Sequence, residues 1–252
     1  MTEQIPRFDT VELNDHWSSV RKRINSTQVR QDPFPFIQVD KVFPPALYQG
    51  LLDHLPDSTA YDFSTAADYA VIGNETRRGA LRFDDPVDAG RMPSALQPFW
   101  RGVTDPAHTQ QLVRSLINKF RPHLQVPANA ITPGEPLNIY GKWLISRDLP
   151  GYELPPHLDV RQKLVAGLFY LPRSEHESPY GTTLLSPKPE REAALAESDR
   201  HAREDFDVAL QLPFRANTFF AFVQSDRSFH GVDTVGPEVA QRDILMFNVN
   251  IA

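Results

Sequence analysis

The chain contains no cysteine among its 252 residues. A disulfide framework, a thiolate zinc site and a cysteine nucleophile are therefore all excluded. The sequence also lacks long apolar runs. Its first ten residues are polar, without the apolar core of a signal peptide, and no later stretch is long enough to cross a bilayer. We therefore expect a cytoplasmic protein with no membrane segment.

Positive charge is in short supply as well. Asp and Glu number 32 against 26 Lys and Arg, so the formal net charge is −6. Binding along a nucleic-acid backbone needs a basic face, and we do not expect nucleic acid as a partner. Hydrophobic residues make up 40% of the chain and include 16 Phe, which is enough for a folded core. Composition and charge give no indication of the oligomeric state.

The first half of the chain carries apolar residues at helical spacing. We expect three helices, over residues 14–24 with Asn14 as the cap, 46–55, and from 104 to 122. An extended segment, residues 32–40, separates the first two. Residues 61–90 have only weak periodicity around an Arg-rich centre, which indicates a solvated loop or hairpin. The alternative is a flap with substrate contacts, since binding residues concentrate on loops held by a rigid scaffold.

From residue 137 onward the pattern changes to short strand-like runs separated by Gly, Pro and Asn. The runs cover residues 137–146, 163–171, 182–185, 214–223 and 243–251. Residues 189–207 are charged and rich in Ala, and we expect them to form an exposed helical insertion. Helices followed by strands predict a mainly β, α+β fold in which a barrel is backed by N-terminal helices. We expect one domain over residues 1–252, with a helical and flap region at 1–130 and the barrel core at 131–252.

A candidate metal site lies between the first two runs, at Pro155-Pro156-His157-Leu158-Asp159. The paired prolines favour an extended backbone before His157. Side chains two positions apart on an extended backbone point to the same face, so His157 and Asp159 can reach one ion. Two imidazoles and one carboxylate on one face of Fe(II) leave other positions open, as in non-haem iron oxygenases. A His-x-Asp triplet alone is weak support, so the assignment depends on a second histidine.

His230 and Arg242 complete the candidate site. His230 follows a hydrophobic strand and precedes Gly231, which lets the backbone pack closely; alone, it is more readily a hydrogen-bonded histidine at a strand end. Arg242 opens an apolar strand, where burying a guanidinium is costly unless a carboxylate meets it. A hairpin would place His230 and Arg242 on adjacent strands of one pocket, with Arg242 binding a dicarboxylate. The alternative is an Arg242 that pairs with Asp243 or Glu238 at a strand edge.

These motifs resemble the Fe(II)- and 2-oxoglutarate-dependent oxygenase superfamily, in particular bacterial members similar to prolyl hydroxylases. The similarity covers about the C-terminal half of the chain. It rests on residues 151–159, 163–172, 181–184, 228–232 and 242–243. The resemblance implies a double-stranded β-helix, the jelly-roll or cupin-like barrel.

The resemblance also implies roles for individual residues. It implies that iron is held by His157, Asp159 and His230, and that Arg242 binds the distal carboxylate of the cosubstrate 2-oxoglutarate. Thr183, in the position of a Gly-x-Thr strand, and Tyr140, on the strand before the His-x-Asp triplet, are the candidates to assist it. Some relatives carry a Ser two positions after the Arg, where this chain has Ile244. The carboxylate must therefore recruit another hydroxyl.

The activity that the resemblance implies is that of a dioxygenase. O2 and 2-oxoglutarate are consumed, succinate and CO2 are released, and an unactivated C–H bond of the substrate is hydroxylated. We expect a small-molecule substrate, such as an amino acid derivative or a natural-product or glycan precursor. Members that halogenate lack the carboxylate that Asp159 provides, which favours hydroxylation. A protein or peptide substrate, a silent barrel-type binding module and a cupin-like metal enzyme without a cosubstrate are the alternatives.

Overall fold

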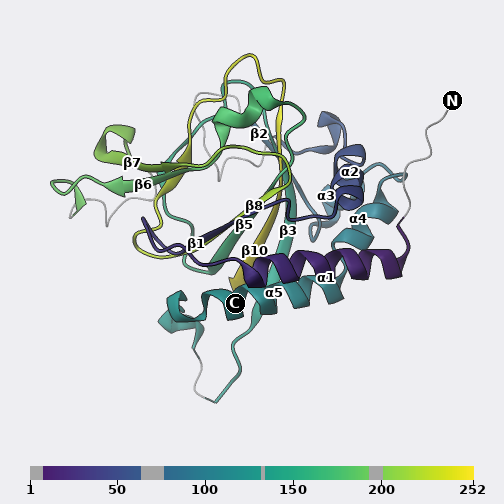
Figure 1. Ribbon diagram of the computed structural model, residues 1–252, viewed down its shortest axis with the longest axis horizontal. Helices are drawn as coiled ribbons and strands as arrows, with labels where there is room; N and C mark the ends of the chain where they lie inside the picture. The colour runs from purple at the N-terminus through teal and green to yellow at the C-terminus, as the bar shows by residue number, and fades with distance from the viewer. Residues whose placement is uncertain (1–7, 64–76, 132–133, 193–200) are drawn as a thin grey trace.

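The computed structural model describes residues 8–63, 77–131, 134–192 and 201–252. Two antiparallel β-sheets face one another, and helices from the first half of the chain pack on the outer side of the larger sheet (Figure 1). The expected class, mainly β with N-terminal helices, is confirmed. No helix in the described ranges is both long enough and apolar enough to cross a membrane.

Among the described residues, the α-helices all lie before β3, which begins at Ile139. They are α1 Thr10–Ser26, α2 Pro45–Asp53, α3 Pro86–Arg91, α4 Gln97–Val103 and α5 Pro106–Phe120. Helix α1 begins four residues before the predicted start at Asn14, because Asp9 is its cap. The Asp9 side chain accepts a bond of 2.9 Å from the Glu12 backbone, and Glu12 accepts one of 3.0 Å from the Asp9 backbone. This capping box stabilises the first turn, which the apolar spacing alone does not indicate.

The larger sheet has six strands in the order β1-β8-β5-β10-β3-β2. These are β1 Phe36–Asp40, β8 Thr218–Val223, β5 Lys163–Tyr170, β10 Arg242–Ile251, β3 Ile139–Asp148 and β2 Arg78–Arg82. Strands β3, β5, β8 and β10 correspond to four of the predicted runs. Strand β2 comes from residues 61–90, which were predicted to form a loop or hairpin; within that segment, residues 64–76 lie outside the described ranges.

The smaller sheet has four strands in the order β4-β9-β6-β7. These are β4 Leu154–His157, β9 His230–Val232, β6 Thr183–Pro187 and β7 Phe206–Gln211. Strand β7 begins inside residues 189–207, where we expected a helical insertion. Residues 193–200 of that segment are not among the described ones, and the part after them contains only the short turn Arg203–Asp205 before β7. Most side chains of β7 are exposed at the sheet edge, so the strand has no apolar run by which to predict it.

Apolar side chains fill the spaces on both faces of the larger sheet. On its outer face, α1, α2, α4 and α5 pack against alternate residues of β3, β5 and β10, with Trp17, Phe169 and Phe247 fully buried. A second apolar cluster lies between the inner face of the larger sheet and the smaller sheet. Its buried members are Phe34, Phe36, Ala166, Leu168, Tyr170, Leu184, Leu212, Phe214, Phe220, Phe222, Ile244 and Met246. We call this second cluster the barrel interior, and the candidate residues border it.

Candidate metal centre

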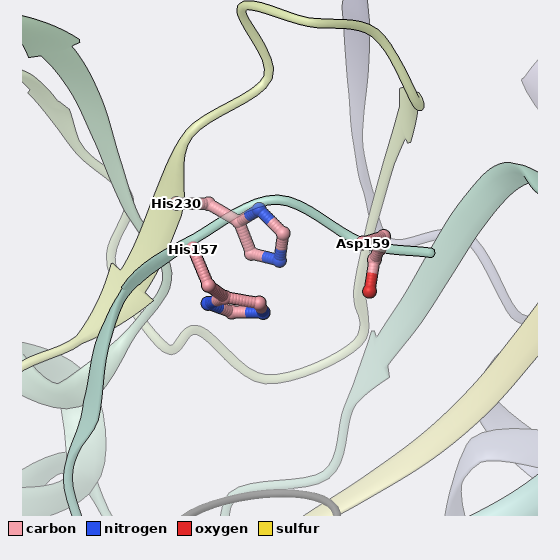
Figure 2. Close-up of side chains that lie close together, drawn as sticks. All are labelled: His157, Asp159 and His230. Carbon is pink, nitrogen blue, oxygen red and sulfur yellow. The ribbon is translucent and has the colours of Figure 1, made fainter. Parts of the chain in front are cut away.

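His157, Asp159 and His230 come together at the edge of the barrel interior. One nitrogen or oxygen atom from each lies within 4.8 Å of the other two. His157 ends β4 and is paired with His230, the first residue of β9, while Asp159 lies two residues beyond His157. Figure 2 shows the two imidazole rings one above the other with the Asp159 carboxylate beside them, and the ring centroids are 4.2 Å apart. The structure thus brings together all three residues of the predicted set.

Both histidines are held in the tautomer that a metal needs. Nδ1 of His157 lies 3.0 Å from the Pro155 carbonyl oxygen, and Nδ1 of His230 lies 2.9 Å from the Ser228 carbonyl oxygen. A carbonyl oxygen can only accept, so each Nδ1 carries the hydrogen and each Nε2 keeps its lone pair. Backbone bonds of this kind orient metal-binding histidines and fix their tautomer. The two Nε2 atoms and a carboxylate oxygen form a donor set that suits Fe(II) with open positions.

Gly231 allows the two histidines to approach. A Cβ at this position would lie 2.6 Å from the carbonyl oxygen of Leu154 on the neighbouring strand. Any larger residue would therefore push β9 away from β4 and separate His230 from His157. The close packing expected of Gly231 follows from this contact.

Burial and charge keep the three side chains ready to bind a cation. Burial, together with the neighbouring His230, lowers the pKa of His157 to about 3. Burial likewise lowers the pKa of His230. Burial raises the pKa of Asp159, but the ammonium of Lys163 and the two imidazoles outweigh it and leave that pKa at about 2. Metal binding requires neutral imidazole and ionised carboxylate, so all three groups are in the binding form at neutral pH.

These shifts predict how the stability of the metal-free protein depends on pH. An unfolded histidine takes up a proton near pH 6.5, whereas folded His157 stays neutral down to about 3. Between these values the unfolded state binds more protons, so the free energy of unfolding should fall as the pH drops below about 6.5. Urea unfolding at a series of pH values measures this slope. His157→Gln should reduce the slope; an unchanged slope in that variant would contradict the assignment.

Arg242 is fully buried at the start of β10. Its Nε donates to the carbonyl oxygen of Tyr180 at 2.6 Å, and its Nη1 donates to the carboxylate of Asp148 at the end of β3. The guanidinium carbon lies 4.4 Å from the ring centroid of Phe214. Arg78 on β2 holds the same Asp148 with two bonds of 2.6 and 2.9 Å. A buried carboxylate thus fixes Arg242 in one orientation.

Two details differ from the sequence expectation. Arg242 pairs with Asp148, while Asp243, its expected alternative partner, pairs with Arg147. The prediction that His230 and Arg242 stand on adjacent strands is wrong, because β9 belongs to the smaller sheet and β10 to the larger. The chain crosses between the sheets in the intervening turn, so the two residues border the barrel interior from opposite sheets.

The barrel interior extends from the candidate metal ligands to Arg242. The ring of Phe222 lies 4.5 Å from that of His230, and the ring of Phe214 packs against Arg242; both phenylalanines belong to the same apolar cluster. Within the described part of the chain, Nη2 of Arg242 has no hydrogen-bond partner, although it is buried. Burying a guanidinium nitrogen without a hydrogen-bond acceptor costs free energy of folding, so a ligand that offers an acceptor at this position would bind favourably. A carboxylate entering the interior would supply one.

Ser146 carries a hydroxyl group that no sequence pattern singled out. It pairs with Ile244 across β3 and β10, two residues from the Asp148–Arg242 pair, and therefore lies on the same face of the sheet as Arg242. Its hydroxyl oxygen is buried and, among the described residues, also unpaired. Tyr170 pairs with Ile244 from the other side, with its hydroxyl bonded to Thr182 at 2.7 Å. Ser146 and Tyr170 therefore flank Ile244 on the two neighbouring strands.

Thr183 and Tyr140 are not brought to Arg242. The Thr183 hydroxyl donates to Gln211 at 2.5 Å, and Thr183 lines a hollow of about 370 Å³, whereas its neighbour Leu184 points into the barrel interior. Neighbouring residues of a strand face opposite ways. Tyr140 lies at the end of β3 opposite to Asp148, and it is 37% exposed in a groove beside α5. Neither residue is therefore used in the function proposed below.

Lys163 and Asp148 are two further charged residues that the sequence did not single out. Lys163 begins β5 and lies against Asp159, while Asp148 ends β3 and holds Arg242. The only signal for Lys163 is a charge at the start of an apolar run. Asp148 lies beyond the end of its predicted run, so no pattern marked it.

Comparisons with known proteins give similarity in fold only. No protein-family model matches the chain, and no curated protein sequence matches it. Among solved structures, a Pseudomonas putida prolyl-4-hydroxylase matches with a TM-score of 0.48 and 13% identity over 93% of this chain and 98% of that one. A Trichoplax adhaerens prolyl hydroxylase in complex with a peptide fragment of hypoxia inducible factor matches with a TM-score of 0.49 and 14% identity. This match covers 96% of this chain and 94% of that one.

A Burkholderia pseudomallei oxidoreductase described as a 2OG-Fe(II) oxygenase family member matches with a TM-score of 0.45 and 12% identity, over 98% of this chain and 93% of that one. Similarity at this level does not identify an activity.

Proposed function

We propose that this protein is an Fe(II)- and 2-oxoglutarate-dependent dioxygenase that hydroxylates a C–H bond of a small molecule. The observation that carries the proposal is the unpaired Nη2 of Arg242, buried on the same apolar interior that His157, Asp159 and His230 border. A metal-binding enzyme without a cosubstrate would not need a buried guanidinium whose Nη2 lacks a hydrogen-bond acceptor in the described ranges. A dicarboxylate held between a metal and Arg242 would satisfy it.

We also propose that the two sheets form a double-stranded β-helix. The order of the strands along the chain supports this. From β3 to β6 successive strands alternate between the larger and the smaller sheet, and the alternation resumes from β7 to β10 after the β6-β7 hairpin. Each crossing of the chain from one sheet to the other continues the winding of the barrel. Strands β1 and β2 extend the larger sheet at its two edges.

Each residue of the site has a distinct task in this proposal. His157, Asp159 and His230 would hold the iron through two Nε2 atoms and one carboxylate oxygen. Arg242, oriented by Asp148, would bind the distal carboxylate of 2-oxoglutarate, and Ser146 would donate a further hydrogen bond to it. Iron, when bound, supplies the redox chemistry that couples oxidative decarboxylation of the cosubstrate to substrate hydroxylation. The apolar cluster would keep bulk water away from the reacting atoms.

Two measurements on the same protein test the proposal. Under anaerobic conditions, Fe(II) and 2-oxoglutarate together should give a weak visible charge-transfer band that neither gives alone. With oxygen admitted, succinate should form, and Arg242→Met should raise the 2-oxoglutarate concentration needed for both signals. Arg215→Met, which changes an exposed arginine on the surface, is the matched control.

The outcomes separate the alternatives. A band without succinate would indicate a binding module, and oxygen consumption without 2-oxoglutarate would indicate a metal enzyme of another class. Absence of both signals would overturn the proposal. If succinate forms, the same succinate assay, run over panels of small molecules and of peptides, identifies the substrate class, and stimulation only by peptides would contradict the small-molecule assignment.

A further inference from the structure

Lys163 is an unusual neighbour for a metal ligand. Its ammonium nitrogen lies 2.5 Å from Oδ1 of Asp159, and each of the two side chains is only 8% exposed. Lysine is almost never buried unless it is paired. Its positive charge acts on all three candidate ligands, because it contributes to the lowered pKa values of His157, Asp159 and His230. The Lys163 ammonium is thus a fixed positive charge beside the residues proposed to bind a metal cation.

The backbone around the pair fixes its geometry. Asp159 and Lys163 are joined by a turn in which the Lys163 backbone nitrogen donates to the Val160 carbonyl oxygen at 3.0 Å. The carbonyl oxygen of Asp159 accepts a bond of 2.6 Å from the side chain of Gln224, which in turn accepts one of 3.0 Å from Ser228. The contact between the ammonium and Oδ1 therefore belongs to an ordered turn and is not a chance meeting of two flexible side chains.

We propose that Lys163 is a positioning residue that occupies one carboxylate oxygen of Asp159 and so leaves a single oxygen for the metal. This inference rests on the proposed function. A carboxylate that bound the metal through both oxygens would fill a position that the cosubstrate or O2 requires. Holding Oδ1 on Lys163 keeps that position open. The cost is weaker metal binding, because the ammonium repels a divalent cation and makes Asp159 a poorer donor.

Three substitutions at position 163 and one control separate charge from structure. Lys163→Met removes the charge and the hydrogen bond, Lys163→Arg keeps both, and Lys163→Gln stays polar should the Met variant fail to fold. Lys22→Met removes one positive charge from the exposed face of α1, far from the barrel interior. Calorimetric titration with Mn(II), and then with 2-oxoglutarate into Mn(II)-loaded protein, gives both affinities without turnover.

We expect Lys163→Met to bind Mn(II) about tenfold more tightly than the wild type, because the variant lacks the ammonium charge that repels the cation. Other partners of metal ligands, which support binding, change metal affinity by about 10- to 100-fold when they are removed, and we expect an effect of similar size in the opposite direction. The same variant should bind 2-oxoglutarate at least about fivefold more weakly, a usual size for coupling between two sites. Lys163→Gln should shift the Mn(II) affinity in the same direction, while Lys163→Arg and Lys22→Met should stay close to the wild type. A side chain that only filled space would not move the two affinities in opposite directions.

The outcomes distinguish this inference from the proposed function. If the wild type binds Mn(II) but folded Lys163→Met or Lys163→Gln binds it equally or more weakly, the role of Lys163 is refuted and the metal centre stands. If Lys163→Arg behaves like Lys163→Met, the charge and hydrogen bond are not what matters, and the inference also fails. If the wild type takes up no Mn(II), the proposed metal centre itself is overturned.

Discussion

Replacing His230 by alanine is expected to lower the affinity for Fe(II) or Mn(II) by at least about 100-fold, because even partners that only orient metal ligands are worth about 10- to 100-fold. The Nδ1 hydrogen of His230 is committed to Ser228, so Nε2 is its one atom available to a metal. Alanine would leave His157 and Asp159 as two ligands instead of three. Calorimetric titration with Mn(II) measures the loss, and succinate formation should disappear with it.

The control for this variant is a histidine outside the site. His123 contacts Gln31 on the outside of the fold, and His123→Ala should bind Mn(II) like the wild type. Circular dichroism before titration establishes that both variants are folded. Undiminished Mn(II) binding in folded His230→Ala would show that the three residues form no metal centre, whatever their proximity.

The grouping of the three candidate metal ligands could be predicted from the sequence because local geometry determines most of it. Two prolines impose an extended backbone, and an extended backbone puts His157 and Asp159 on one side. Predicting that His230 joins them required one more assumption, that the two strands pack closely. Gly231 allows this packing. Each of these inferences depends on neighbours in the sequence, where the rules of backbone geometry are strong.

The surroundings of Arg242 could not be predicted, because they depend on which strands pair. Asp148 meets Arg242 only because β3 and β10 are neighbours in the larger sheet, and no local pattern specifies that pairing. The expected hairpin was wrong for the same reason: short turns also connect strands of facing sheets. Thr183 illustrates a different limit, since its motif predicts a strand but not which face of the strand is the inner one.

Replacing Asp148 by asparagine is expected to destabilise the protein by about 3–5 kcal/mol, the usual cost of removing one partner from a buried ion pair. The carboxylate lies between Arg78 and Arg242 and has no exposed side-chain surface. Asparagine would leave two buried guanidinium groups facing a neutral amide. Urea unfolding measures the loss of stability, which should be large against a typical total of about 5–15 kcal/mol.

Asp243→Asn is the matched control, because it separates loss of stability from loss of function. Asp243 is also buried and holds Arg147 at 2.7 Å, but it follows Arg242 on the strand and faces the opposite side of the sheet. Both variants should therefore be destabilised to a similar extent. Only Asp148→Asn should also weaken binding of 2-oxoglutarate to Mn(II)-loaded protein, since Asp148 pairs with Arg242 whereas Asp243 pairs with Arg147. Equal cosubstrate affinity in the two folded variants would mean that Arg242 does not need its buried carboxylate, and the case for Arg242 as the cosubstrate anchor would lose its structural basis.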